Sequence, residues 1–77
     1  MKIEVRFFAS LRERVGREQL SLDLPEPATV ADAWAAATGG MERPPNTLAA
    51  INMDYVDFDT PVKEGDEVAF FPPVTGG

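Results

Sequence analysis

The sequence predicts a small α+β domain: a mixed sheet with one main helix across one face and a short helical turn after the first strand. Apolar and polar residues alternate over residues 2–8, as they do in a half-buried strand. Apolar residues between 30 and 37 follow the spacing of one helix face. Residues 67–71 form a late apolar stretch that predicts the last strand. The length of 77 residues suits one domain.

The first strand has two faces that differ in polarity. One face carries Ile3, Val5 and Phe7, and the other carries Lys2, Glu4, Arg6 and Phe8. The next residues, Ser10 to Glu13, have the spacing of a capping box and predict a short helical turn. Gly16 is placed to end that turn as a left-handed C-cap.

A second strand and the main helix follow. Alternating leucines over residues 20–24 predict the strand, which the prolines of residues 25–27 interrupt. Thr29 is the expected N-cap of the helix, with Asp32 favourably placed toward its dipole. Its apolar face consists of Val30, Ala33, Trp34 and Ala37, and the glycines at 39 and 40 end it. We therefore expect Trp34 to be a core residue.

The second half of the chain predicts strands separated by tight turns. A third strand covers residues 47–51, a turn covers 52–54, and residues 55–56 pair briefly. A further turn at residues 64–66 leads into the last strand. This order matches the ubiquitin-like β-grasp, in which the first and last strands are parallel neighbours at the centre of the sheet. We assign residues 1–71 to this domain and residues 72–77 to an extended C-terminal tail.

Strand alternation places Phe8 and Phe71 on the side of the sheet away from the helix. Because their strands are adjacent in the predicted fold, the two rings form a candidate docking face, which Tyr55 would extend. The alternative is that the two rings cover each other, or that a loop or the proline pair covers them.

Composition excludes several classes of function. The chain has no cysteine and no histidine, and therefore no disulfide, thiolate metal site or histidine base. Its net charge of −6 argues against nucleic acid and anionic membranes as partners. The alternating N-terminus is neither a signal peptide nor a membrane span, and a cytoplasmic location is expected. Asp54, Asp57 and Asp59 lack the glycine and glutamate of a calcium loop, so a solvated turn is the better interpretation.

The last residues offer a different kind of chemistry. Gly76 and Gly77 form a thin tip that can enter a narrow cleft, and Pro72 and Pro73 hold the preceding segment extended. Adenylation would turn the weakly electrophilic terminal carboxylate into a good acyl donor. A sulfur nucleophile would then leave a thiocarboxylate, whereas a lysine would leave an isopeptide. The alternative is a frayed, inert terminus.

Three segments of the chain carry a family resemblance: VRFFASLRE at residues 5–13 followed by Val15 and Gly16, AIN at residues 50–52 with Tyr55 and Val56, and GDEVAFFPPVTGG at residues 65–77. They resemble the MoaD family, the small sulfur-carrier subunit of molybdopterin synthase. The stalk of residues 70–75 is the specific part, because a Gly-Gly end alone also occurs in ubiquitin and in the thiamine-pathway carrier. The resemblance covers essentially the whole chain and implies the same β-grasp fold.

The resemblance implies a non-catalytic carrier that donates sulfur during molybdenum cofactor biosynthesis. A ubiquitin-activating-type enzyme would adenylate Gly77 with ATP, and a sulfur-donor protein would supply the sulfur of the thiocarboxylate. The large synthase subunit would bind the pterin precursor and receive the tail with Gly76, while this chain would hold no cofactor or metal. The interface would comprise Phe8, Arg12, Tyr55, Phe71, Pro72, Pro73, Val74 and Thr75.

Two other functions remain open from the sequence. The chain could be a ubiquitin-like protein modifier, or a sulfur carrier for thiamine, cysteine or tRNA thiolation. It could also be an interaction domain whose terminus is inert.

Overall fold

The computed structural model describes residues 1–73 and contains two helices and five strands within that range. In chain order these are β1 (Lys2–Phe7), α1 (Ser10–Val15), β2 (Gln19–Asp23), α2 (Val30–Thr38), β3 (Leu48–Ile51), β4 (Asp54–Val56) and β5 (Glu67–Phe71).

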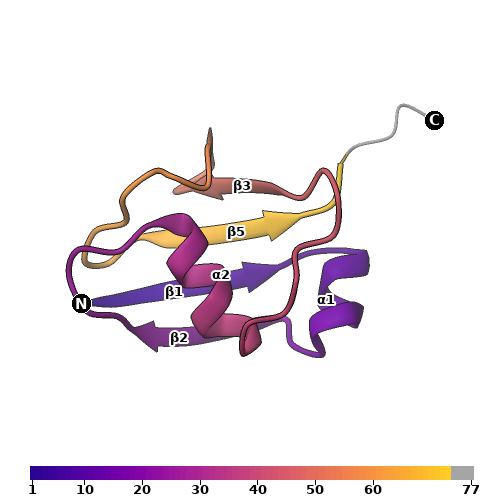
Figure 1. Ribbon diagram of the computed structural model, residues 1–77, viewed down its shortest axis with the longest axis horizontal. Coiled ribbons are helices and arrows are strands. Elements are labelled where there is room, and N and C mark those ends of the chain that lie inside the picture. Colours follow the sequence, from indigo (N-terminus) through magenta and orange to yellow (C-terminus); the bar gives the residue numbers. More distant parts are fainter. Residues whose placement is uncertain (74–77) are drawn as a thin grey trace.

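The strands form one mixed sheet in the order β2-β1-β5-β3-β4. Strands β1 and β5 are parallel, with Val5 opposite Val68 and Phe7 opposite Phe70, and the other pairs are antiparallel. Helix α2 crosses one face of the sheet, and β1 and β5 both point toward the end where α1 lies (Figure 1). The predicted ubiquitin-like β-grasp is confirmed.

The core fills the space between the central strands and α2. Phe70 is the centre of an aromatic cluster, with its ring centroid 5.7 Å from that of Phe7 and 5.1 Å from that of Trp34. The indole of Trp34 is buried and donates to the Met41 carbonyl at 2.6 Å. The prediction that Trp34 is a core residue is confirmed, because its polar atom is satisfied while its rings pack inside.

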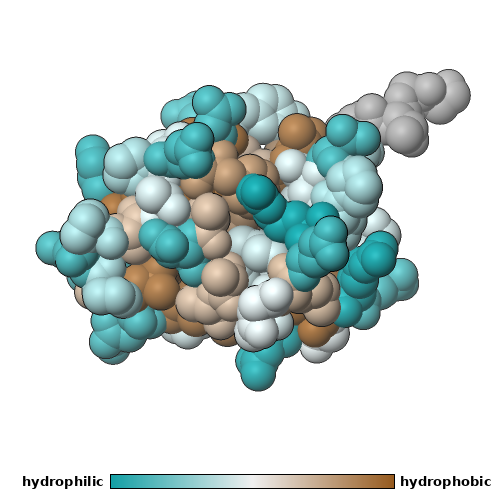
Figure 2. All heavy atoms as spheres, in the orientation of Figure 1, coloured by the Kyte–Doolittle hydropathy of each residue, from teal (hydrophilic) through white to brown (hydrophobic). Residues whose placement is uncertain are grey.

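Helix α2 has the caps that the sequence predicts. The Thr29 hydroxyl accepts from the Asp32 amide at 3.3 Å, and the Asp32 carboxylate accepts from the Thr29 amide at 2.8 Å. These two bonds form a reciprocal capping box. Gly39 ends the helix with φ 71°, a left-handed conformation that costs glycine little. Figure 2 shows the face that carries α2, where apolar residues lie in the middle and hydrophilic residues surround them.

The predicted capping box of the short helix α1 is wrong. Ser10 is already a helical residue, and the N-cap is Ala9, which makes no side-chain capping bond. The helix is held instead by burial of Leu11, whose amide also donates to the Phe8 carbonyl at 3.1 Å. Gly16 is the left-handed C-cap as predicted, with φ 83°.

Other element boundaries differ from the predictions by about one residue. Phe8 lies outside β1, although its amide still donates to the Phe70 carbonyl at 3.1 Å. Leu24 follows β2, and Thr47 precedes β3. Asp54 is the first residue of β4, so the turn consists of Asn52 and Met53.

Candidate functional site

The face of the sheet opposite α2 carries several exposed apolar side chains. The large ones are Phe8 (42% exposed), Leu48 (37%), Tyr55 (75%) and Met53 (94%). Leu48 is opposite the half-buried Phe71 across the β3–β5 ladder, and cross-strand partners share a face. We call this surface the open face. Its exposed apolar side chains are a feature typical of interaction sites.

The centre of the open face is a shallow hollow of about 510 Å³. Its floor consists of Ala50 and Ala69, which lie opposite each other in the ladder. The larger side chains around this floor are Arg6, Phe8, Met53, Tyr55, Glu67 and Phe71. Small residues below and large residues around them leave room for an inserted side chain from a partner.

The predicted aromatic residues Phe8, Tyr55 and Phe71 all lie on this face, but Phe8 has a different neighbour from the other two. The ring centroids of Tyr55 and Phe71 are 5.6 Å apart, so Tyr55 partly covers Phe71. Phe8 lies instead against the guanidinium of Arg6, whose central carbon is 5.4 Å from the ring centroid. The prediction that Phe8 and Phe71 point away from the helix agrees with these positions, while their part in an interface stays a prediction.

The remaining predicted interface residues lie toward the carboxyl end of β5 or beyond it. Arg12 is a half-exposed residue of α1, with its Nη1 3.9 Å from Glu18 Oε1. An exposed ion pair of this length contributes little, so Arg12 can exchange it for another partner. Pro72 and Pro73 follow β5 outside regular secondary structure. The predictions for Val74, Thr75, Gly76 and Gly77 lie outside the described residues.

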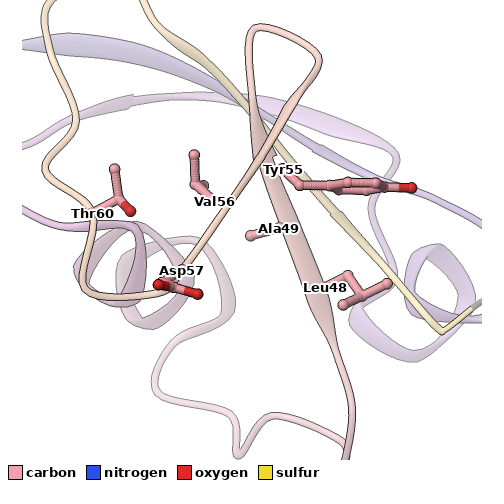
Figure 3. Close-up of a pocket in the computed structure, with 6 residues that line it drawn as sticks. All are labelled: Leu48, Ala49, Tyr55, Val56, Asp57 and Thr60. Atoms are coloured by element: carbon pink, nitrogen blue, oxygen red, sulfur yellow. The ribbon is translucent and has the colours of Figure 1, made fainter.

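A second hollow, of about 670 Å³, lies beside the edge formed by β3 and β4 (Figure 3). Leu48 and Tyr55 extend to the same side in this view, while Asp57 and Thr60 come from the segment after β4. The polar groups around it are the Asp57 carboxylate and the hydroxyls of Tyr55 and Thr60. This hollow extends the apolar surface around the sheet edge.

The polar part of the open face lies over β1 and β2. The Glu4 carboxylate accepts from the Ser21 hydroxyl and from Gln19 Nε2, the latter at 3.3 Å. These hydrogen bonds, with Ser21 first, favour the charged form and lower the pKa of Glu4 below its ordinary value of 4.5. Glu4 is therefore an ionised carboxylate already engaged with the edge strand at neutral pH.

Two kinds of site are not seen in residues 1–73. This part of the chain has no cluster of three or more acidic side chains arranged to hold a metal ion. It also has no helix with the length and apolar character needed to cross a bilayer.

Sequence reasoning placed Arg6 on the same strand face as Phe8 but did not single it out as a site residue, and it missed Leu48 and Met53 as members of the open face. For Leu48 a usable signal was present. Ala49 is a core residue, so strand alternation places Leu48 and Ala50 on the opposite face. No sequence pattern indicated Met53, because its position depends on a tight turn in which both Asn52 and Met53 have positive φ.

Comparison with known proteins identifies the family. The model of the ThiS family matches residues 5–77. This chain belongs to the ThiS family. Among ThiS-family relatives, the molybdopterin synthase sulfur carrier subunit of Escherichia coli is 44% identical over 84 aligned positions, which cover 97% of this chain and 99% of the relative. The resemblance to the MoaD family is thereby confirmed.

Solved structures similar to this ThiS-family chain include two of particular interest. SAMP1 of Haloferax volcanii matches with a TM-score of 0.81 at 28% identity, covering 100% of both chains. A chain from the complex of subunits 1 and 2 of the molybdopterin-converting factor of Helicobacter pylori matches with a TM-score of 0.70 at 27% identity, again covering 100% of both chains.

Proposed function

We infer that this chain is the sulfur-carrier subunit of a molybdopterin synthase. The observation that carries this inference is the 44% identity to the Escherichia coli carrier over nearly the full length of both chains. The similarity to a chain from a two-subunit complex supports a large subunit as the partner. The open face supplies a surface for that subunit, and β5 leads from this face directly toward the tail.

The proposed chemistry takes place at Gly77. Its carboxylate attacks the α-phosphate of ATP on a ubiquitin-activating-type enzyme, and pyrophosphate leaves. Hydrosulfide supplied by a donor protein then attacks the acyl carbonyl and displaces AMP, so that a C–S bond replaces the C–O bond to AMP and Gly77 ends in a thiocarboxylate. In the large subunit this sulfur passes to the pterin precursor, and hydrolysis restores the carboxylate.

The folded body orients the tail and takes no chemical part in this proposal. The parallel β1–β5 pair is at the centre of the sheet and is buried on the α2 side, so the start of the tail at Pro72 follows directly from a core strand. Docking through Phe8, Tyr55 and Phe71, with Arg12 as a polar contact, fixes the direction in which residues 72–77 leave the domain. Positioning of this kind turns a diffusive encounter into an oriented one.

Catalysis belongs to the partners in this proposal. The chain is a non-catalytic subunit and binds no cofactor, while ATP binds to the activating enzyme and the pterin precursor binds to the large subunit. All of these steps are proposed to occur in the cytoplasm.

The decisive experiment extends the chain by one residue beyond Gly77. The extended protein is expected to fold and to bind the large subunit, but to lose sulfur transfer completely, because the acyl group is no longer at Gly77. Intact-mass measurement of the unextended protein from its native cell should show a fraction in which sulfur replaces one oxygen. Sulfur transfer by the extended protein would falsify the assignment of Gly77.

A second function, attachment to protein lysines, is supported by the similarity to SAMP1, a small archaeal modifier protein. The same activated Gly77 would then form an isopeptide bond with a lysine, releasing AMP. Conjugates that contain a second polypeptide, absent when the chain is extended at Gly77, would establish this activity.

A further inference from the structure

Arg6 lies on the open face without a partner for its charge. It lies on β1, on the face that Glu4 and the next residue after the strand, Phe8, also occupy, and it is opposite Ala69 of β5. Its Nε is buried and has no hydrogen-bond acceptor among residues 1–73. The ion pairs of the described range join Met1 to Asp23 and Arg12 to Glu18, so neither involves Arg6.

The carboxylates nearest in the sheet leave Arg6 unpaired. Glu4 is on the same face of the same strand, but its two oxygens accept hydrogen bonds from Gln19 and Ser21 on the side of β2. Glu67 lines the same hollow as Arg6 but is not its ion-pair partner. The guanidinium is therefore held over the Phe8 ring, with donors available to another molecule.

A partner that covers the hollow must also supply a counter-charge for the Arg6 guanidinium. In the free chain, water can hydrate the outer guanidinium nitrogens, since Arg6 is only partly buried. Covering Phe8, Ala69 and Phe71 removes that water, and a desolvated cation without a counter-charge is strongly unfavourable. A carboxylate is the natural solution, because its two oxygens match the planar fork of a guanidinium.

We propose that Arg6 binds a carboxylate side chain of the large synthase subunit and thereby sets the register of docking. This inference rests on the proposed function. It describes the partner surface as an apolar side chain that enters the hollow above Ala50 and Ala69, with an aspartate or glutamate beside it. Arg6 is thus a specificity-determining residue in addition to the predicted contact of Arg12.

The test measures binding of the large subunit from the same organism by calorimetry. Arg6→Leu is expected to weaken binding by at least about tenfold. Arg6→Lys keeps the charge but lacks the planar pair of donors, so its affinity should lie between those of Arg6→Leu and the wild type. Added salt should weaken wild-type binding more steeply than Arg6→Leu binding.

Arg43→Leu is the matched control. The Arg43 guanidinium also lies over a phenylalanine ring, 3.8 Å from the centroid of Phe58, and Phe58 stacks on Phe70 on the core side of the sheet. This variant removes the same charge from the other side of the sheet and should leave affinity unchanged. Melting temperatures of all variants establish that each one is folded.

Phe71→Ala distinguishes a failure of the Arg6 contact from a failure of the open face as the docking surface. If Phe71→Ala weakens binding while Arg6→Leu binds as tightly as the wild type, the role of Arg6 is refuted and the carrier function stands. If neither variant weakens binding, the open face is not the docking surface and both the role of Arg6 and this mode of docking are refuted.

Discussion

The adjacent phenylalanines Phe7, the last residue of β1, and Phe8, directly after it, should respond to truncation in opposite ways. Phe7 is 1% exposed and faces α2, whereas Phe8 is 42% exposed and faces away from it. Phe7→Ala is expected to damage folding and to spare the docking surface. Phe8→Ala is expected to spare folding and to damage docking.

The magnitudes follow from the contacts of each ring. Phe7 packs with Phe70 and Trp34 at centroid distances of 5.7 and 5.9 Å, and truncating a buried phenylalanine costs about 3–5 kcal/mol. A chain of 77 residues is stable by about 4–12 kcal/mol. The loss therefore lowers the melting temperature by about 12 °C or more, at about 4–8 °C per kcal/mol.

Phe8→Ala removes much less from the folded state. The ring is 42% exposed and lies against the Arg6 guanidinium, whose central carbon is 5.4 Å from the ring centroid, and such a contact is worth about 0.5–1 kcal/mol. Binding to the large subunit should weaken by about 2 kcal/mol, at the lower end of the range for interface anchors.

Thermal unfolding followed by circular dichroism measures the first effect, and calorimetric titration with the large subunit measures the second. Similar falls in melting temperature for the two variants would refute the assignment of Phe8 to the open face. Full affinity of Phe8→Ala would show that the exposed ring is not part of the interface.

Three further perturbations test other parts of the structure. Phe71→Ala should weaken binding of the large subunit by about 2–4 kcal/mol, and an unchanged calorimetric affinity would contradict its role as an anchor. Thr29→Ala removes the side-chain bond to the Asp32 amide and should cost about 1 kcal/mol, seen as a lower melting temperature; no change would mean that the cap contributes nothing. Ser21→Ala should raise the pKa of Glu4 toward 4.5, measured by carboxyl NMR titration. Because the folded-state pKa is lowered, the Ser21 bond stabilises the fold above pH 4.5 and this contribution is lost as pH falls through the lowered value. The variant should therefore lose less stability on acidification, and an unmoved pKa would show that Ser21 is not the cause.

Much of the fold is local and could be predicted from the chain. The alternation around Ile3, Val5 and Phe7 and the helical spacing through Trp34 each depend on residues close in sequence. The same local patterns assigned Phe8 and Phe71 to the side away from the helix. The capping spacing at Ser10 was also a local pattern, but it did not decide the cap: Ala9 is the N-cap of α1, and Leu11 is buried in the core.

Other features of the site depend on which strands become neighbours. Leu48 reaches Phe71 only through the β3–β5 ladder, and Met53 reaches the hollow only through the turn before β4. The isolation of Arg6 depends on Glu4 turning to Gln19 and Ser21 of β2. No periodicity in a single segment carries this information.

The sequence by itself determined the secondary-structure elements to within about a residue, the inward and outward faces of the first and last strands, and the chemistry available to a chain without cysteine or histidine. Side-chain periodicity and residue chemistry are properties of short segments, so they can be derived without a fold. Only the tertiary structure decided that side chains from β1, β3, β4 and β5 meet around Ala50 and Ala69, and that Arg6 lies beside them without a counter-charge. Strand order and register arise from contacts between residues far apart in the chain, where the free energy of burying a shared core selects one pairing among many.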